Sequence, residues 1–338
     1  MKKLLALALA LALLALCACI SPAKDVNTPY NPDDIAVINA IIDNNGLRWE
    51  KAAPADGSYV PSGWAGNLAE DYTEDLEYYG ITWSEEDANK RITTLYIPEH
   101  GLIGKMDVSG LTALDWLNCE GNQLSGLNVS GLVALDTLGC GRNQLTELHV
   151  SGLSALTYFD CADNQLTELN LSGLTKLERL WCENNQLAEL DLSRLHALNL
   201  LYCEGNQLTS LDVSGSPALT HLFCSENRLA SLNVSGLTSL KCLHCGDNQL
   251  ATLDLSGLTA LENLYCSMNQ LATLDLSGQS ALSWLLCSFN QLTSLALCPT
   301  AEYETVWVQY NRFTDPAQIT GFDPALWDTG DFAFAPQE

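Results

Sequence analysis

An asparagine recurs at intervals of 21 residues along more than half of this chain. Ten copies keep the spacing, at Asn122, Asn143, Asn164, Asn185, Asn206, Asn227, Asn248, Asn269, Asn290 and Asn311. A cysteine stands three residues before each of the first nine, from Cys119 to Cys287, and Val308 takes that place before the last. A period this strict predicts stacked repeats, a solenoid, rather than a globular domain.

The sequence pattern within one unit predicts which residues form each side of the coil. Apolar and variable residues alternate around each cysteine, which predicts a strand with Leu and Cys facing inward. The asparagine then closes a turn, where its short amide side chain can pair with inward-pointing backbone groups of neighbouring coils. A later stretch such as Leu127 to Val129 alternates again, predicting a second short extended segment on the opposite wall. Its middle residue, for example His149 or Asp191, should face water.

The pattern L-x-x-L-x-C-x-x-N-Q-L followed by x-x-L-D-L-S resembles the leucine-rich repeat family, in the cysteine-bearing form of bacterial internalin-type repeats. The resemblance covers residues 92–312. It implies a right-handed coil with a parallel β-sheet on the concave face, little helix in the repeats, and a family habit of binding proteins on that face. Membership of a fold family does not name the ligand.

The start of the chain predicts export. Two lysines precede an unbroken Leu/Ala run that is too short to span a bilayer, so residues 1–18 are interpreted as a signal peptide. The Leu-Cys-Ala-Cys sequence ending at Cys19 resembles a bacterial lipobox, which implies a lipidated Cys19, a tether over residues 19–30 and a lipid-anchored surface or envelope protein. The alternative is ordinary secretion after cleavage at Ala18 or Ala23.

The charge of the chain excludes one class of partner. It has 41 acidic and 15 basic side chains, and loss of the signal peptide with Lys2 and Lys3 changes the net charge from −26 to −28. Because nucleic-acid binding depends on Lys and Arg neutralising phosphates, we expect no nucleic-acid partner. Solubility explains the acidity better than cation binding, since the sequence has no Asp-x-Asp-x-Asp-Gly calcium loop. We expect a monomer without a cofactor.

Nine of the 13 cysteines lie in the inward column. Adjacent turns about 4.8 Å apart fall within the roughly 4.4 to 6.8 Å that a disulfide needs. Stacked parallel side chains, however, point the same way, so we expect a ladder of reduced, buried thiols. Cys242 and Cys245 face opposite sides of their strand and cannot share a zinc ion.

Segments without the repeat flank the solenoid and should cap its apolar ends. At residues 31–91, Asn31 as N-cap and Pro32 at the first position predict a helix that ends at Gly46. Three tryptophans after this helix would cover the edge of the first coil, Trp49, Trp64 and Trp83. Residues 313–338 should seal the other end with Trp327, Phe332 and Phe334.

Outward positions of the predicted concave sheet carry an unusual number of rings. The column between Leu and Cys reads Asn118, Gly139, Asp160, Trp181, Tyr202, Phe223, His244, Tyr265, Leu286 and Trp307. The column two residues earlier adds Trp116, Tyr158 and Trp284. A contiguous exposed aromatic patch predicts a binding surface for an extended protein segment or a glycan. Three carboxylates would select against anionic partners, Asp160, Glu183 and Glu204.

Other interpretations of this face remain open. Rings on neighbouring strands stabilise each other, so the column could be a packing device of a structural envelope protein. His221, Cys242 and Asn263 share one column with His244 diagonal to the cysteine, residue types also found in cysteine proteases and metal sites. The cysteine lies between the other two, whereas the asparagine must orient the histidine that activates the thiol. We therefore expect recognition, as in an adhesin, rather than catalysis or metal binding.

Overall fold

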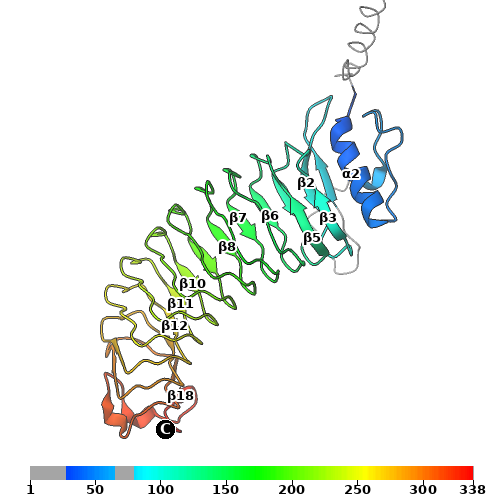
Figure 1. Ribbon diagram of the computed structural model, residues 1–338. Coiled ribbons are helices and arrows are strands. Elements are labelled where there is room, and N and C mark those ends of the chain that lie inside the picture. The colour runs from blue at the N-terminus through cyan, green and yellow to red at the C-terminus, as the bar shows by residue number, and fades with distance from the viewer. Residues whose placement is uncertain (1–27, 65–79, 338) are drawn as a thin grey trace, which may run out of the picture.

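A computed structural model describes residues 28–64 and 80–337. The predicted signal peptide, Cys19 and most of the predicted tether lie outside the described residues. The described chain is an elongated solenoid that bends into an arc, with α2 at one end and the C-terminus at the other (Figure 1). Among the described residues, no helix has the length and apolar character needed to cross a bilayer.

One sheet of 13 strands runs the length of the solenoid in the order β1, β2, β4, β6, β7, β8, β9, β10, β11, β12, β14, β16, β18. β1 (Gly80–Trp83) is antiparallel to β2 (Ile92–Tyr96), and every later pair is parallel. The other bounds are β4 (Trp116–Asn118), β6 (Thr137–Gly139), β7 (Tyr158–Asp160), β8 (Arg179–Trp181), β9 (Leu200–Tyr202), β10 (His221–Phe223), β11 (Cys242–His244), β12 (Asn263–Tyr265), β14 (Trp284–Leu286), β16 (Thr305–Trp307) and β18 (Phe332–Ala333). The predicted parallel sheet is confirmed.

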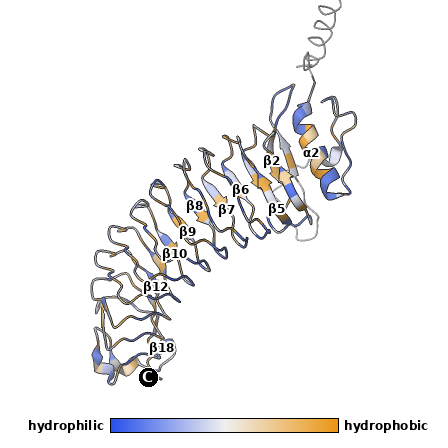
Figure 2. Cartoon of the chain, in the orientation of Figure 1, coloured by the Kyte–Doolittle hydropathy of each residue, from blue (hydrophilic) through white to orange (hydrophobic). Residues whose placement is uncertain are grey.

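The interior is a stack of identical columns. The central residue of each strand, Leu in all but β7, where it is Phe159, and the cysteine two residues later are fully buried from Leu117 and Cys119 to Leu285 and Cys287. Hydrophobic residues recur in every coil along the arc (Figure 2). All nine ladder cysteines are free thiols. Each coil therefore covers the apolar side of the next, and the prediction that Leu and Cys face inward is confirmed.

The asparagine ladder satisfies backbone groups in two coils at once. Asn206 Nδ2 donates to Cys203 O at 3.2 Å in its own coil and to Cys182 O at 3.0 Å in the coil before. Its Oδ1 accepts from Leu187 N at 2.9 Å. The same set of bonds repeats from Asn143 to Asn311. The predicted structural role of the ladder is confirmed.

The opposite wall differs in part from its prediction. It forms strands near the two ends of the solenoid: β3 (Ile103–Asp107) with β5 (Gln123–Asn128), and β13 (Thr273–Leu276), β15 (Ser294–Leu297) and β17 (Ile319–Thr320). In the described coils between them it forms an isolated bridge of Asp212 with Asn233. The middle residues, such as His149 and Asp191, face water as expected.

The N-terminal cap begins as the sequence predicts. Helix α2 (Pro32–Asn45) has Asn31 as its N-cap, which accepts from two backbone N–H groups, and ends at a left-handed Gly46. Asp34 is fully buried and bonds both Arg91 and the backbone N of Ile92, at 2.8 Å each, which fastens the helix to the first parallel strand. Trp64, in the 3-10 helix η1 (Ser62–Trp64), is buried, while Trp49 and Trp83 pack against the core.

The C-terminal cap adds a last strand and an aromatic cluster. β18 pairs with β16 and so continues the sheet beyond the last asparagine. Trp327, Phe332 and Phe334 pack against the core, as predicted. Phe322 joins them, with its ring centroid 4.6 Å from that of Trp327. Two further 3-10 turns lie here, η2 (Pro316–Gln318) and η3 (Pro324–Leu326).

Candidate binding face

The rings of the outward column form a continuous stack on the concave sheet. Strand register brings the residues that end consecutive strands into line, from Trp181 in β8 to Tyr265 in β12. Their successive centroid distances are 5.9, 4.1, 4.5 and 3.9 Å, and Tyr158 extends the stack with its centroid 4.5 Å from that of Trp181. We call these six residues the ring stack: Tyr158, Trp181, Tyr202, Phe223, His244 and Tyr265.

The ring stack is half-buried rather than freely exposed, which corrects the expectation of an exposed stripe. Trp181, Tyr202 and Phe223 stack nearly parallel, with interplanar angles of 8° and 4°, whereas His244 stands edge-on to Phe223 at 75°. Neighbouring rings, one strand spacing apart, therefore shield part of each other from solvent. Trp116, Trp284 and Trp307 are more open, with 41%, 39% and 43% of their surfaces exposed. Among the described residues, no ring contact joins these three tryptophans to the stack. Leu286 separates Trp307 from it.

Carboxylates crowd the first part of the ring stack. Burial and then the charges of Asp160, Asp163 and Glu204 raise the pKa of Glu183 to about 7. Burial also raises the pKa values of Asp160 and Glu204. The Oε2 atom of Glu183 is covered and has no hydrogen-bond partner. Around neutral pH, Glu183 is therefore partly protonated, and its carboxyl group lies on the face that carries the rings.

The residues considered for catalysis are brought together without becoming reactive. His221, Cys242 and Asn263 lie side by side in register on β10, β11 and β12. Burial, followed by the charges of Glu204 and Glu262, raises the pKa of the Cys242 thiol to about 11, whereas a nucleophilic cysteine needs a lowered value. Burial lowers the pKa of His244 to about 4. Within the described part of the chain, no three His, Cys, Asp or Glu side chains are grouped to hold a metal ion.

Sequence reasoning missed a second repeated feature, at the residue before each ladder asparagine. All ten such residues have left-handed backbone, with φ from 49° to 68°: Gly121, Arg142, Asp163, Asn184, Gly205, Glu226, Asp247, Met268, Phe289 and Tyr310. Gly accepts this conformation freely and Asn or Asp tolerates it, but other L-residues are strained by roughly 1–2 kcal/mol. The glycines at two of these places were the available signal.

The last three members of this left-handed column are large and apolar. Met268, Phe289 and Tyr310 are 53%, 45% and 39% exposed, and the rings of Phe289 and Tyr310 stack with centroids 4.3 Å apart. They stand just beyond the carboxyl ends of β12, β14 and β16. Strained backbone combined with exposed apolar surface is uncommon in residues that serve packing alone.

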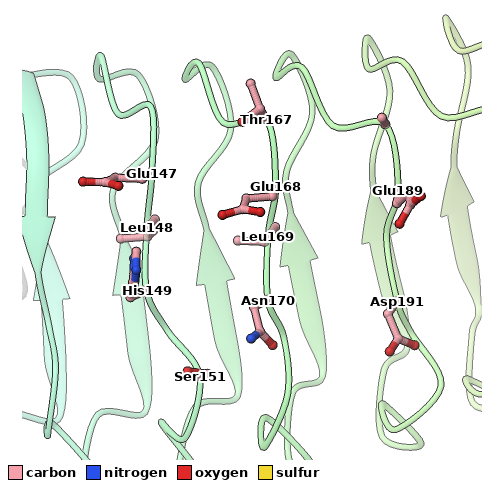
Figure 3. Close-up of a pocket in the computed structure, with 11 residues that line it drawn as sticks. Glu147, Leu148, His149, Ser151, Thr167, Glu168, Leu169, Asn170, Glu189 and Asp191 are labelled. Carbon is pink, nitrogen blue, oxygen red and sulfur yellow. The ribbon is translucent and has the colours of Figure 1, made fainter.

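The opposite wall is hollowed over part of its length. A shallow depression of about 520 Å³ lies over three coils, with Glu147, Glu168 and Glu189 in one row and His149 and Asp191 below them (Figure 3). The row of carboxylates is open to solvent and meets no ring cluster. This wall therefore lacks the convergence of apolar and polar groups found on the sheet.

The period, the inward columns and the parallel sheet together form a leucine-rich repeat fold with a cysteine ladder. A family model described as Leucine Rich repeats (2 copies) matches residues 154–195 and 238–278. No curated protein sequence matches the chain.

Solved bacterial structures share this architecture. The functional domain of InlJ from Listeria monocytogenes, whose description includes a cysteine ladder, is similar at 26% identity and a TM-score of 0.54, covering 70% of this chain and 64% of that domain. YopM from Yersinia enterocolitica is 29% identical with a TM-score of 0.59, covering 65% and 47% of the two chains. An internalin, inlF, from Listeria monocytogenes shares the fold at 22% identity, a TM-score of 0.59 and coverage of 69% and 74%. This chain thus spans less than two thirds of the InlJ and YopM chains.

Proposed function

We propose that the protein is a recognition module that binds an extended segment of an extracellular protein across its concave face. The observation that carries this proposal is the ring stack, which runs unbroken through six successive strands from Tyr158 to Tyr265. Rings along the concave sheet offer apolar contact at a low cost in conformational entropy, because each ring has few rotatable bonds. Internalin-type relatives support the choice of a protein partner.

The proposed site comprises the ring stack together with Trp116, Trp284 and Trp307. The three tryptophans are the more exposed members and so can contact a ligand with their faces. Trp284 Nε1 donates to Glu304 at 2.9 Å, which holds its indole in one orientation. An acidic face of this kind disfavours anionic partners.

Catalysis is not part of the proposal. The raised thiol pKa of Cys242 and the lowered imidazole pKa of His244 both work against a Cys–His pair. We also propose that the chain is exported and held at the cell surface by lipid on Cys19, where an adhesin would act; labelling with radioactive palmitate, and its loss in Cys19→Ala, would test the anchor.

The test of binding compares the protein with its Trp181→Ala, Tyr202→Ala double variant on an array of extracellular proteins and glycans. We expect a protein ligand that the double variant loses, while circular dichroism and melting stay close to those of the parent. Asn170→Ala with Glu189→Ala on the opposite wall is the matched control and should keep the ligand. A large loss of stability in the ring variant, without any ligand for the parent, would instead identify the stack as a packing device.

A glycan ligand would change the proposed partner but not the proposed site. Aromatic rings also stack on the apolar faces of sugars, so the ring stack by itself does not distinguish a protein ligand from a glycan. A glycan hit that the ring variant loses would keep the site and replace the partner. A protein hit that the ring variant keeps would remove the ring stack from the site.

A further inference from the structure

The apolar end of the left-handed column continues into an acidic stretch. Reading toward the N-terminus, Tyr310, Phe289 and Met268 are followed by Asp247 and Glu226, one residue per coil. All five are exposed, and backbone bonds tie each of their coils to the next, for example Met268 N to Ser288 O and Phe289 N to Gln309 O at 3.0 Å each. The five side chains therefore form one edge of the solenoid, which we call the left-handed edge.

Among the described residues, the acidic half of this edge forms no ion pair and the apolar half remains exposed. The ion pairs between described residues involve neither Asp247 nor Glu226. Met268, Phe289 and Tyr310 expose between 39% and 53% of their surfaces despite holding a strained backbone. Elsewhere in the same column stand Gly121, Asn184 and Gly205, residue types that accept or tolerate this backbone. The apolar residues thus add open surface at a cost to the backbone.

We propose that the left-handed edge is a second docking surface, which binds an extended peptide segment with apolar side chains at one end and basic side chains at the other. Apolar side chains would cover Phe289 and Tyr310, and Lys or Arg would pair with Asp247 and Glu226. The charge of the whole chain supports a basic partner, since 41 acidic residues face 15 basic ones.

The spacing of the edge limits the sequence of the partner. Coils are about 4.8 Å apart, and an extended peptide advances about 3.3 Å per residue. The two coils from Phe289 to Asp247 therefore correspond to about three peptide residues. A matching segment has its first basic residue about three positions from its apolar pair. This surface is distinct from the ring stack, so the inference does not depend on the proposed function.

Short labelled peptides test the inference on the full protein by fluorescence anisotropy. One probe has Phe-Leu, two serines and Lys-Lys; a second has the reversed order of the same residues, because a strand-like ligand can run either way. The controls are a shuffled probe with alternating Lys and apolar residues, and a probe with Glu in place of Lys. We expect one ordered probe to bind about tenfold more tightly than the shuffled one, and salt to weaken that binding.

Asparagine variants remove each half of the edge without new backbone strain, because Asn184 already occupies this column at φ 53°. The Met268→Asn, Phe289→Asn, Tyr310→Asn variant should lose the ordered probe. The Asp247→Asn, Glu226→Asn variant should bind it more weakly and with less dependence on salt. Arg142→Asn is the matched control, exposed in the same column six coils from Met268, and should bind normally.

Several outcomes would overturn the inference. These are equal affinity for the ordered and shuffled probes, binding that survives the apolar triple variant, and the absence of binding by every probe. A glycan that the triple variant alone loses would replace the basic peptide by another ligand. Loss of the ordered probe in the Trp181→Ala, Tyr202→Ala variant would place it on the ring stack instead, which separates this test from that of the proposed function.

Discussion

The asparagine ladder and the left-handed column are adjacent in the chain and repeat ten times each, yet they vary in opposite ways. Every ladder position is asparagine and at least 91% buried, since the most exposed members retain 9% of their surface. The column one residue earlier includes glycine, acids, a base and large apolar residues, and most of its members are exposed. The ladder position is constant because buried backbone groups need the asparagine side chain as their partner. The position before it varies because only its backbone conformation is constrained.

The ring stack is intermediate between these two columns. From Trp181 to Tyr265 its residues end their strands, directly before the buried cysteines, and they vary only among rings. Each ring touches the next, so packing limits the choice without dictating one residue. A surface that is both variable and restricted to rings suits a binding face.

The largest expected effect belongs to the ladder. Asn206→Ala removes the partner of two buried carbonyls and of Leu187 N, and each unsatisfied buried group costs about 1–3 kcal/mol. We expect unfolding in guanidinium to show a loss of about 3 kcal/mol or more. The exposed Asn170, changed to Ala, is the control and should lose under 1 kcal/mol. Equal losses in the two variants would contradict the distinction between buried and exposed asparagines.

Glu183 should make the ring-bearing face sensitive to pH. Its pKa rises from 4.5 to about 7 on folding, so the folded state holds the proton more tightly. The contribution to stability is full below pH 4.5 and disappears as pH rises through about 7. Because the group is partly solvated, we expect Glu183→Gln to raise stability at pH 8 by about 1–2 kcal/mol and to change little at pH 4.

Melting curves between pH 4 and 8 measure this effect. Glu189→Gln, on the exposed opposite wall, serves as the control and should shift the melting temperature equally little at both ends. A Glu183→Gln variant that follows the parent curve at every pH would show that the buried carboxylate does not titrate in this range.

His244 should show the opposite dependence on pH. Burial lowers its pKa from 6.5 to about 4, so its contribution to stability is full above pH 6.5 and is lost as pH falls toward 4. His244→Phe keeps a ring between Phe223 and Tyr265 but cannot take up a proton. Thermal unfolding at pH 5 and pH 8 should show an advantage of about 1 kcal/mol for the variant at the lower pH, discounted for partial exposure. A difference in stability between the variant and the parent that is the same at both pH values would contradict this expectation.

The smallest expected effect concerns the left-handed column. Met268→Asn replaces a residue strained at φ 57° by one that tolerates this backbone, so we expect a gain of about 0.5–1 kcal/mol. Asp247→Met, the reciprocal change one coil away, should lose a similar amount. Chemical denaturation of both single variants measures the pair. Losses in both would mean that contacts of Met268, rather than backbone strain, set the balance.

Local signals predicted those parts of the fold that one chain segment decides. The N-cap Asn31 and the left-handed Gly46 bound the helix in the structure as they did in the sequence. The alternation around each cysteine correctly assigned the inward columns. The same rule placed His221, Cys242 and Asn263 on one face, because strand register follows directly from the repeat length.

Features that depend on contacts between coils were not predictable in this way. The alternation of the opposite wall is the same in every coil, but among the described residues strands form there only near the ends. The half-burial of the ring stack also depends on neighbouring coils, since a ring's exposure is set by the next ring. The left-handed column carries too mixed a set of residues to reveal its backbone, apart from Gly121 and Gly205.

The sequence by itself determined the repeat, the inward columns and the direction in which each outward residue points, because a strict period of 21 residues imposes one register on every coil. Only the tertiary structure decided which outward residues meet. Interactions between coils set the distances between stacked rings and raise the pKa of Glu183. They also align the exposed residues of the edge from Glu226 to Tyr310. Such interactions depend on the spacing and curvature of the stack, which no single repeat contains.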